Sequence, residues 1–440
     1  MRDEKADKAL AIVKRLREAG FAAYFAGGCV RDRLLGIAPH DYDIATDARP
    51  ETVRALFDKT VAVGAQFGVI IVVVAEDRFE VATFRADAPY LDGRHPSAVR
   101  FGTIEEDAKR RDFTIGALFL DPIAGREIDL VGGLRDLRAG IIRAIGDPRQ
   151  RFAEDHLRLL RAVRFAARFN FVIEPQTWQA LRELAGSVPA VSPERIGQEL
   201  TSMLTGGGAG RALDLALQAG LLEHLLPEVV ALAGCEQPAN FHPEGDVYRH
   251  TRLALSMLPA GCSETLAWGL LLHDVAKPVC RAVGDGRTTF YGHPERGAAM
   301  AEAILRRLRR SRLVQERVAY LVRGHLRLCM APRMRTATLK RMLAEEGFAE
   351  LLELARLDAL ASNSYLGFYH FCRRALRTAQ PQEIRPARLL TGDDLIQLGH
   401  RPGPRFKQIL REVEDLQLDG AIRSREQALA YVREHYEPGN

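Results

Sequence analysis

The spacing of apolar residues changes along this chain, from a mixture of strand-like and helical periods to helical spacing. Residues 5–19 predict a helix, because their apolar side chains recur every three or four positions: Ala9, Ile12, Val13 and Leu16. Gly20 would end this helix. We expect a short strand from Phe21 to Ala26 and a short helix from Val30 to Leu35 to follow it.

Two segments in the first hundred residues predict a β-hairpin. Residues 69–75 are all apolar, and a second strand at residues 78–85 follows a short polar turn. Because side chains alternate along a strand, Glu80 shares a face with Ala82. A polar loop around Gly93 is expected next, and then a helix and a small sheet complete this part of the chain.

From Phe152 onward the predicted elements are helices only. Residues 152–169 predict one continuous helix, whose apolar stripe contains Leu157, Leu160, Val163, Phe165 and Ala167. The polar side of this helix contains Asp155, Arg158, Arg161, Arg164 and Arg168. A glycine-rich break at residues 206–211 precedes a further helical unit, and a histidine-rich helical region extends from about residue 241 to 375.

These periods predict an α+β fold, in which an α/β head with a small mixed sheet precedes all-helical regions. A chain of 440 residues is long enough for about three domains of ordinary size. The expected boundaries give a head at residues 1–140, a helical neck and body at 141–235, a histidine-rich domain at 236–380 and a helical tail at 381–440.

The composition is that of a soluble globular protein, with 47% hydrophobic and 27% charged residues. The longest apolar run is strand-sized, so we expect no membrane span, and the charged N-terminus favours a cytoplasmic location. The 6 cysteines are scattered without a CxxC motif, which argues against a disulfide framework and a zinc finger. A net charge of +5 is compatible with a polyanionic partner but does not require one.

The glycine pair Gly27-Gly28 and the acidic residues after it have the properties of a phosphate and metal site. Without a Cβ, the glycines allow backbone N–H groups to approach a phosphate, and Arg31 offers a planar fork to its oxygens. If Asp41 and Asp43 lie on a strand, both carboxylates share one face, which suits Mg²⁺. A helix cap and surface acids in a turn explain each feature alone, but their occurrence in one short stretch favours a site.

Glu80 could bring a third carboxylate to Asp41 and Asp43. Such a set could hold two Mg²⁺ ions, which would activate an attacking hydroxyl and stabilise a leaving pyrophosphate. The protein would only need to hold the reacting groups in line.

Asp155 and Arg158 could read the edge of a nucleotide base. On a continuous helix their three-residue spacing would place both side chains on one face. Asp accepts from an exocyclic amine and Arg donates to a ring nitrogen, an order that cytosine and adenine match and that uracil and guanine reverse. An ordinary surface ion pair is the alternative explanation.

Several motifs occur here in the order found in class II nucleotidyltransferases, which comprise the bacterial CCA-adding enzymes and similar poly(A) polymerases. They are GGxVRD, DxD, EVATFR, RRDFTI, DPIAGREIDL and EDxxRxxR, within roughly residues 20–235. The resemblance implies Asp41 and Asp43 as Mg²⁺ ligands, with Glu80 as the third acid. For the nucleotide it implies Gly28 and Arg31 at the triphosphate, Arg111 and Asp112 at the ribose, and Asp155 and Arg158 at the base, positioned by Glu154 and Arg161.

The chain departs from this family at Gly116, where the family usually has asparagine. Any polar contact that the asparagine side chain makes is therefore lost or replaced here.

The histidine-rich region resembles an HD-type metal-dependent phosphohydrolase, a domain that follows the helical part in some bacterial CCA-adding enzymes. The implied ligands are His250, His273, Asp274 and Asp358, with His293 and His325 added in a two-metal version. His273 and Asp274 lie in an apolar segment, where polar groups are costly unless something binds them. Mixed imidazole and carboxylate ligands suit Ni²⁺, Mn²⁺ or another transition metal better than Mg²⁺. Lys277 could meet a phosphate, and purely structural histidines are the alternative.

The sequence therefore predicts an enzyme that extends RNA 3′ ends without a nucleic-acid template, most simply by adding CCA to tRNA from CTP and ATP. Addition of A alone and poly(A) synthesis use the same motifs and stay open. The rivals are a phosphohydrolase that acts on nucleotides or RNA 2′/3′ phosphates, and a non-catalytic RNA-binding protein. The arginine-rich segment 306–312 is either a solvated helix face or an RNA contact. We expect a monomer or a homodimer.

Overall fold

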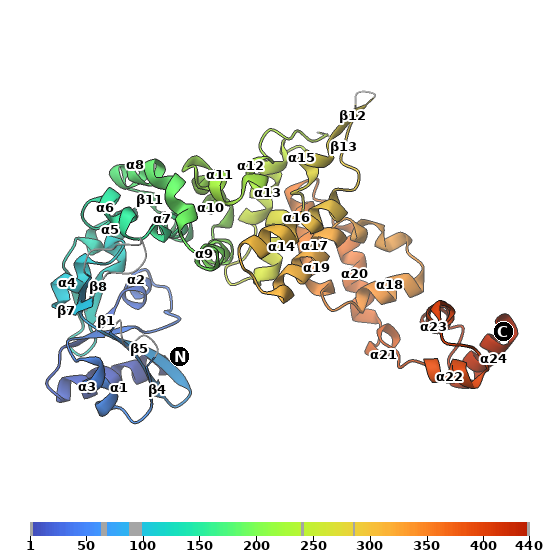
Figure 1. The fold of residues 1–440 in the computed structure, drawn as a ribbon, viewed down its shortest axis with the longest axis horizontal. Coiled ribbons are helices and arrows are strands. Elements are labelled where there is room, and N and C mark those ends of the chain that lie inside the picture. Colours follow the sequence, from blue (N-terminus) through green and yellow to red (C-terminus); the bar gives the residue numbers. More distant parts are fainter. Residues whose placement is uncertain (1–2, 63–67, 88–98, 239–241, 285–286, 438–440) are drawn as a thin grey trace. The chain divides into compact units, whose positions relative to one another are not determined.

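The chain folds into two compact units in the computed structural model (Figure 1). The first unit comprises residues up to Val230 and two short segments at 259–261 and 307–309, and the second comprises the other residues from Ala231 onward. The residues that the structure describes are 3–62, 68–87, 99–238, 242–284 and 287–437. A mixed sheet lies in the first unit and the second is mainly helical, so the predicted α+β fold is confirmed.

Seven strands of the first unit form one sheet in the order β3-β4-β5-β2-β1-β8-β9. They are β1 (Ala23–Ala26), β2 (Ile44–Thr46), β3 (Thr60–Val61), β4 (Val69–Val74), β5 (Asp77–Thr83), β8 (Leu118–Asp121) and β9 (Arg126–Asp129). Strands β4 and β5 are the predicted hairpin, while β2 and β5 are parallel neighbours. Helix α1 (Glu4–Glu18) buries the predicted apolar stripe. The predicted loop around Gly93 lies outside the described residues.

Short elements connect the strands of this sheet or form separate two-stranded sheets. The helices are α2 (Gly28–Leu34), α3 (Pro50–Leu56), α4 (Ile104–Lys109) and α5 (Gly133–Ala139), with a 3₁₀ turn at Thr114–Gly116. The strands are β6 (Arg85–Asp87), β7 (Val99–Phe101) and β10 (Ile141–Ile142). The expectation that Asp41 and Asp43 lie on a strand is wrong, because β2 begins at Ile44 and both acids belong to the irregular segment before it.

Seven helices complete the first unit within its described residues. They are α6 (Pro148–Glu154), α7 (Leu157–Phe169), α8 (Pro175–Leu184), α9 (Pro193–Thr205), α10 (Ala209–Gln218), α11 (Leu221–Leu225) and α12 (Pro227–Val230), with a 3₁₀ segment at Ala185–Ala190. The predicted continuous helix over residues 152–169 is wrong. Asp155 has an extended backbone, with φ −149°, and its Oδ1 accepts from the Leu157 N–H at 3.1 Å. This local bond competes with the helical ladder and separates α6 from α7.

The expectation of helices alone after Phe152 is also wrong in two places. Strand β11 (Val172–Ile173) pairs in parallel with β10, and β12 (Ala282–Gly284) forms a hairpin with β13 (Arg287–Thr289). These strands are two or three residues long, too short to produce an alternating pattern that could be recognised in the sequence.

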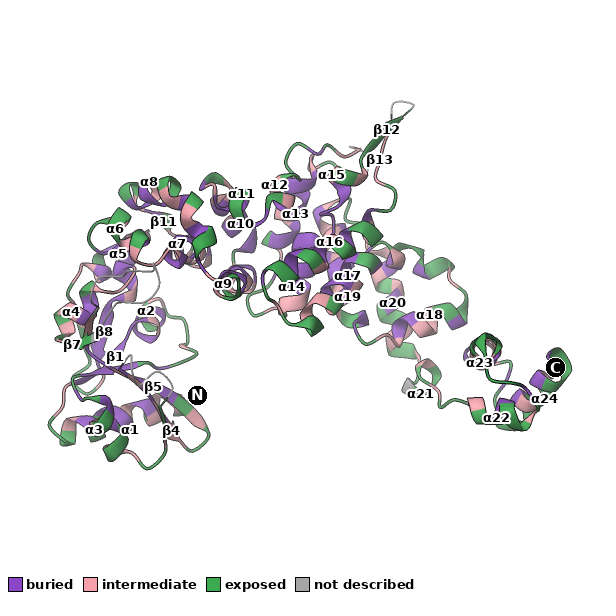
Figure 2. Ribbon diagram, viewed as in Figure 1, coloured by how far each residue is buried: buried purple, intermediate pink, exposed green. Residues whose placement is uncertain are grey.

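The second unit is a helical domain followed by a small tail. Its helices are α13 (Val247–Ser256), α14 (Glu264–Leu272), α15 (Lys277–Cys280), α16 (His293–Arg307), α17 (Arg312–Gly324), α18 (Thr336–Leu343), α19 (Phe348–Ala361), α20 (Gly367–Thr378), α21 (Pro381–Ile384), α22 (Gly392–Gln397), α23 (Pro404–Leu418) and α24 (Arg425–His435), with a 3₁₀ segment at Arg327–Arg333. Helix α14 is buried along almost its whole length, as Figure 2 shows for the centre of this domain. The tail has its own core around Leu395, Ile409 and Val432. Among the described residues, no helix is long and apolar enough to cross a membrane.

Gly208 lets α10 approach α7 closely. It has a left-handed φ of +73°, and a Cβ there would lie 2.5 Å from the Ala167 carbonyl oxygen. We expect Gly208→Ala to add this clash to the cost of about 1 kcal/mol that a left-handed alanine carries. Amide hydrogen exchange in α7 and α10 should therefore become faster. Gly125→Ala is the matched control, because Gly125 has φ +66° with nothing within 4 Å of its Cβ position. Equal effects of the two substitutions would contradict close packing at Gly208.

Candidate active site

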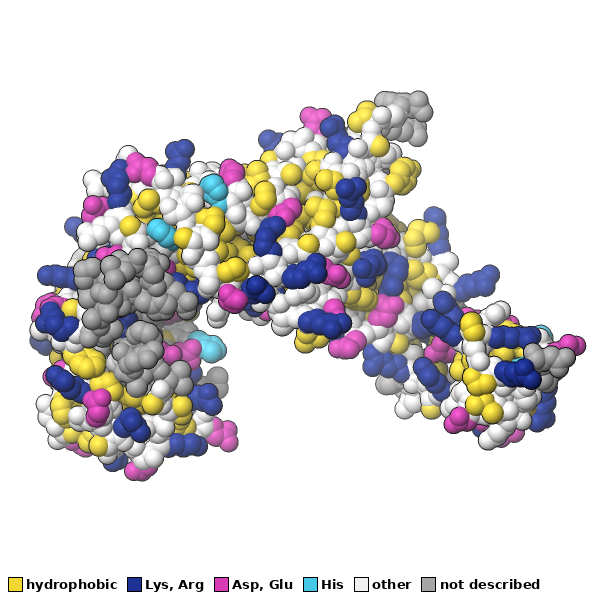
Figure 3. Space-filling model, viewed as in Figure 1, with side chains coloured by type: hydrophobic (Ala, Val, Ile, Leu, Met, Phe, Trp, Pro, Cys, Tyr) yellow, Lys and Arg dark blue, Asp and Glu magenta, His cyan; other side chains and the backbone are white. Residues whose placement is uncertain are grey.

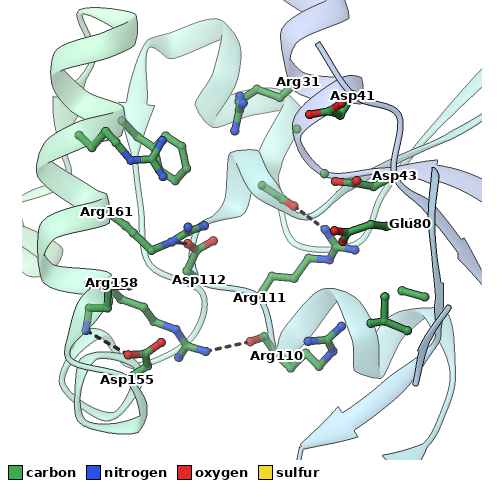
Figure 4. A pocket seen from close by; sticks show the side chains of 18 of the residues that line it. Arg31, Asp41, Asp43, Glu80, Arg110, Arg111, Asp112, Asp155, Arg158 and Arg161 are labelled. Atoms are coloured by element: carbon green, nitrogen blue, oxygen red, sulfur yellow. Dashed lines mark hydrogen bonds and ion pairs between the residues drawn. The ribbon is translucent and has the colours of Figure 1, made fainter. Parts of the chain in front are cut away.

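A cavity of about 830 Å³ in the first unit brings together the residues that the sequence singled out (Figure 4). In this view Asp41, Asp43 and Glu80 lie on one side, and Asp155 and Arg158 on the other. The cavity is lined by all the predicted site residues of the first unit except Glu154: Gly27, Gly28, Arg31, Asp41, Asp43, Glu80, Arg111, Asp112, Asp155, Arg158 and Arg161. Residues more than a hundred positions apart in the sequence therefore share one space.

The sheet register brings two of the acidic residues together. Strands β2 and β5 are parallel and pair Ile44 with Val81, so Asp43, the residue just before β2, lies next to Glu80 in the middle of β5. Burial, followed by the negative charge of Glu80, raises the pKa of Asp43 to about 6. A bound cation would stabilise the ionised form of Asp43 beside the second carboxylate, so this pair fits a divalent metal.

Asp41 already has a cationic neighbour. Lys5 of α1 places its Nζ 2.6 Å from Asp41 Oδ1, and His40 Nδ1 lies 2.9 Å from the other carboxylate oxygen. These two contacts lower the pKa of Asp41. The side chain of Asp41 is 64% exposed, so it is open to solvent and can exchange Lys5 for a metal ion.

The glycine turn has the close backbone approach that its sequence predicted. Gly27 adopts φ +71°, and a Cβ on it would lie 2.8 Å from Arg111 Nη1. Its N–H donates to the Leu118 carbonyl at 2.8 Å, which fixes the turn to strand β8. Arg31 is 5% exposed, and its Nη2 lies 3.7 Å from the position of a Cβ on Gly28. The guanidinium therefore lies beside the turn, where a phosphate could contact both.

Arg111 and Asp112 each have a fixed orientation in the middle of the cavity. Arg111 Nη2 lies 3.2 Å from Asp107 Oδ2, and Nη1 donates to the Gly116 carbonyl at 3.0 Å. Arg161 Nε donates to Asp112 Oδ2 at 2.6 Å. Although burial opposes ionisation, the charge of Arg161 keeps the pKa of Asp112 below its usual value. Both side chains are thus held in fixed orientations beside the cavity.

Gly116 contributes its backbone to this arrangement. A Cβ at this position would lie 3.4 Å from Asp112 Oδ1, which is ordinary contact. A Cβ at position 116 would therefore contact Asp112, and the glycine leaves that carboxylate oxygen without a side-chain neighbour from this position.

Asp155 and Arg158 are held by different partners. Arg158 Nη1 donates to Glu154 Oε2 at 2.6 Å, whereas Arg195 of α9 donates to Asp155 Oδ2 at 2.7 Å. Within the described residues no ion pair joins Asp155 to Arg158, so the alternative of a simple surface ion pair between them does not hold. Arg161, which the resemblance implied as a partner of this pair, contacts Asp112 instead.

Arg195 is the residue of this site that sequence reasoning missed. It follows Asp155 by 40 positions and lies on a separate helix, so no local spacing connects the two. Asp107, which holds Arg111, was missed for a different reason, since its buried carboxylate is indistinguishable from a surface acid of α4 in the sequence.

The second unit contains a buried cluster of histidines and aspartates. It consists of His250, His273, Asp274, His293, His325 and Asp358, contributed by five helices or helix ends. His250 Nε2 lies 3.2 Å from His273 Nε2 and 3.0 Å from Asp358 Oδ1. His293 Nε2 lies 3.3 Å from His325 Nε2 and 3.4 Å from Asp274 Oδ1. The structure therefore brings together all six predicted ligands.

The outer hydrogen bonds of this cluster orient the ligand nitrogens inward. His293 Nδ1 lies 2.7 Å from the Phe290 carbonyl, and His325 Nδ1 lies 2.6 Å from the Val322 carbonyl. A neutral imidazole that donates through Nδ1 has a lone pair on Nε2, so two lone pairs face each other. Burial lowers the pKa of His325 to about 4, which disfavours a proton between them. These contacts are those of metal-ligating histidines.

Asp274 provides a further argument that this cluster fits a metal. Its buried Oδ1 has no hydrogen-bond partner, although it lies 3.8 Å from His325 Nε2. Its other oxygen lies 2.7 Å from Lys277 Nζ, so the lysine that could meet a phosphate is paired here. An unpartnered buried carboxylate oxygen is costly, and a divalent ion would satisfy it.

The arginine-rich segment has carboxylate partners. Arg310 Nη2 lies 2.6 Å from Glu264, and Arg312 Nε lies 2.7 Å from Glu316. On the face seen in Figure 3, Lys and Arg side chains are distributed over both units. RNA contact by this segment stays a prediction.

Comparison with known proteins matches three family models in chain order. These are the poly A polymerase head domain at residues 23–143, the probable RNA and SrmB-binding site of polymerase A at 170–232, and the HD domain at 247–362. The CCA-adding enzyme of Levilactobacillus brevis is 31% identical over 97% of both chains. The chain belongs to the CCA-adding enzyme family.

Other relatives agree over different lengths. The CCA-adding enzyme of Enterococcus faecalis is 32% identical over 96% of this chain and 94% of its own length. That of Bacillus licheniformis is 46% identical over 50% of this chain and 55% of its own length, so this match spans about half of the relative. The crystal structure of the Bacillus stearothermophilus CCA-adding enzyme in complex with CTP has a TM-score of 0.74 and 28% identity, covering 99% of this chain and 98% of its own. The fold is thus that of CCA-adding enzymes.

Proposed function

We propose that this chain adds nucleotides to tRNA 3′ ends without a nucleic-acid template, using CTP and ATP to complete the CCA terminus. The observation that carries the proposal is the single cavity that contains an acidic cluster, a glycine turn with an arginine, and a fixed Asp–Arg set. These three features match the metal, phosphate and base requirements of one bound nucleotide. Relatives named CCA-adding enzymes that align over nearly the whole chain support it.

Different residues of the chain would bind the triphosphate, the ribose and the metal ions. Gly28 and Arg31 would bind the triphosphate, and Arg111 and Asp112 would contact the ribose. Mg²⁺ held by Asp41 and Asp43, with Glu80 beside them, would supply the charge needed to activate the RNA hydroxyl and stabilise pyrophosphate. The protein would contribute alignment, because its charged groups are already held in place by carboxylate or backbone partners.

The test of the function uses tRNAs that end before CCA, after C and after CC, with sequencing of the products. We expect wild-type protein to complete all three to CCA. Extension of the CC-ending tRNA alone would indicate an A-adding enzyme, and long A tails would indicate a poly(A) polymerase. Absence of extension on every tRNA would overturn the proposal.

Replacing Asp43 by alanine should abolish incorporation and leave tRNA binding near that of the wild type. The carboxylate lies next to Glu80 of the neighbouring strand β5, and loss of a metal ligand should cost several kcal/mol of transition-state stabilisation, roughly a thousandfold or more in rate. Asp41→Ala should act in the same direction. Single-turnover incorporation and filter binding measure the two effects. Incorporation above a tenth of the wild-type rate in both variants would exclude the metal assignment.

Asp155 and Arg158 should select the base by the order of donor and acceptor. Alanine at either position should lower incorporation of C and A, and should also reduce discrimination against U and G, because the penalty for an unpaired buried edge disappears. Arg195→Ala should act like Asp155→Ala, since Arg195 holds that carboxylate. Single-nucleotide incorporation with each of the four triphosphates measures this. An unchanged preference in both alanine variants would mean that the base is read elsewhere.

The buried cluster favours a second activity, hydrolysis of phosphate esters by the HD domain. Its specific support is the unpartnered Asp274 Oδ1 among inward-facing imidazoles. We expect the purified protein to bind Ni²⁺ or Mn²⁺ and to hydrolyse 2′,3′-cyclic or 2′-phosphate substrates, and we expect His273→Ala to lose both properties while retaining nucleotide addition. Metal analysis and phosphate release measure them. His370→Ala, outside the cluster, is the control. Metal binding without hydrolysis on any substrate would indicate a structural site.

A further inference from the structure

Helix α7 presents four arginines to the cavity, and each is paired with a carboxylate from a different element of the first unit. Two of them, Arg158 and Arg161, belong to the base and ribose sites described above. The other two, Arg164 and Arg168, line the same cavity and have no role in that description. The four pairs are Arg158–Glu154 at 2.6 Å, Arg161–Asp112 at 2.6 Å, Arg164–Glu199 at 2.5 Å and Arg168–Asp32 at 3.0 Å.

Asp32 is shared between two arginines. Its Oδ1 accepts from Arg31 Nε at 2.8 Å and from Arg31 Nη2 at 2.6 Å, while its Oδ2 accepts from Arg168 Nη2 at 3.0 Å. Asp32 is 7% exposed. One carboxylate therefore balances two guanidinium groups, and this bridge keeps one positive charge in excess beside the cavity.

Two phenylalanines of α7 fix the planes of these guanidinium groups. Arg31 Cζ lies 4.7 Å from the ring centre of Phe169, and Arg168 Cζ lies 5.0 Å from the same centre. Arg164 Cζ lies 4.3 Å from the ring centre of Phe165. Stacking of this kind restricts the rotation of a side chain and leaves its edge available to an anion.

The electrostatics of the cluster favour an anionic ligand. Burial lowers the pKa of Arg31, and the positive charges of Arg168 and Arg164 act in the same direction. Three guanidinium groups are thus close enough to repel one another, with Asp32 and Glu199 as their carboxylate partners. A bound polyanion would relieve this repulsion.

We infer that Arg168 binds the terminal phosphates of the incoming nucleotide together with Arg31, and that Asp32 positions both guanidinium groups for this task. The same clamp would hold the released pyrophosphate. Arg31 lies beside the Gly27-Gly28 turn, and Arg168 reaches the same carboxylate from the base-reading helix. Phosphate binding and base reading are therefore connected through one bridge. This inference rests on the proposed function of the cavity as a nucleotide site.

Binding measurements test the clamp without requiring nucleotide transfer. Isothermal titration with Mg²⁺–pyrophosphate, CTP and CMP should be carried out on the wild type, Arg168→Gln and Arg138→Gln. Arg138 is an exposed arginine of the same unit outside the cavity. We expect Arg168→Gln to weaken pyrophosphate and CTP binding by about tenfold, the loss typical of one charged hydrogen-bonding group, and to change CMP binding by less than about twofold. Arg138→Gln should change none of the three.

The role of Asp32 is tested by a binding measurement that a purely structural role would not change. Asp32→Asn should weaken pyrophosphate binding as Arg168→Gln does, and the double variant should lose less than the sum of the two, because both act on one bridge. Asp32→Glu, which keeps the charge, should recover part of the binding. If Asp32→Asn does not fold, Asp32→Glu and Arg168→Gln decide the question.

The outcomes separate the clamp from the proposed function. Pyrophosphate binding by a folded Arg168→Gln within about twofold of the wild type would overturn the clamp, and so would an equal loss of CTP and CMP binding. Wild-type protein that binds pyrophosphate and CTP through Arg168 but extends no tRNA would support the clamp and refute the proposed function. If the wild type extends tRNA and Arg168→Gln binds pyrophosphate and CTP as the wild type does, the proposed function is supported and the clamp is refuted.

Discussion

Pairing of buried and half-buried charges around α7 is the constraint on which the candidate active-site cavity depends. A guanidinium that leaves water must gain a carboxylate or a ring face, and the four arginines of this helix obtain their carboxylates from α2, α6, α9 and the segment after α4. The helix can satisfy all of them only when these elements surround it. The ion pairs therefore fix where the head and the helical part of the first unit meet, and that meeting place is the cavity.

On the acidic side of the cavity, in contrast to the arginines of α7, two carboxylates lie together without a basic partner in the described part of the chain. Asp43 and Glu80 are held next to each other by the parallel register of β2 and β5, and no arginine or lysine of the described residues forms an ion pair with either. Their repulsion is a cost of folding that a bound cation offsets. The HD cluster uses the same principle with different side chains, since His293 and His325 direct Nε2 toward each other and Asp274 Oδ1 has no hydrogen-bond donor. In both units, acidic or imidazole side chains lie where a bound cation would stabilise them.

The sequence predicted most of the local features because they depend on near neighbours. The stripe of α1 and the β4–β5 hairpin follow from periods that the sequence displays directly, whereas the six candidate ligands of the HD cluster came from a resemblance and are brought together by five helices or helix ends. Its local errors have physical causes as well. The Asp155 side chain accepts a bond from the Leu157 N–H and interrupts a helix that apolar spacing predicted to be continuous, and strands as short as β11 have no period to detect.

The sequence by itself determined the types of chemistry available: carboxylates and a glycine turn near the N-terminus, an arginine-rich helix face, and six histidine or aspartate ligands farther on. Only the tertiary structure decided which charges meet. Arg161 pairs with Asp112 rather than with Asp155, Arg195 pairs with Asp155, and Asp32 joins Arg31 to Arg168. The contacts of Asp112, Asp155 and Arg168 connect residues from 40 to 136 positions apart, and over such separations the partner of a charge is set by the packing of whole elements rather than by spacing along the chain.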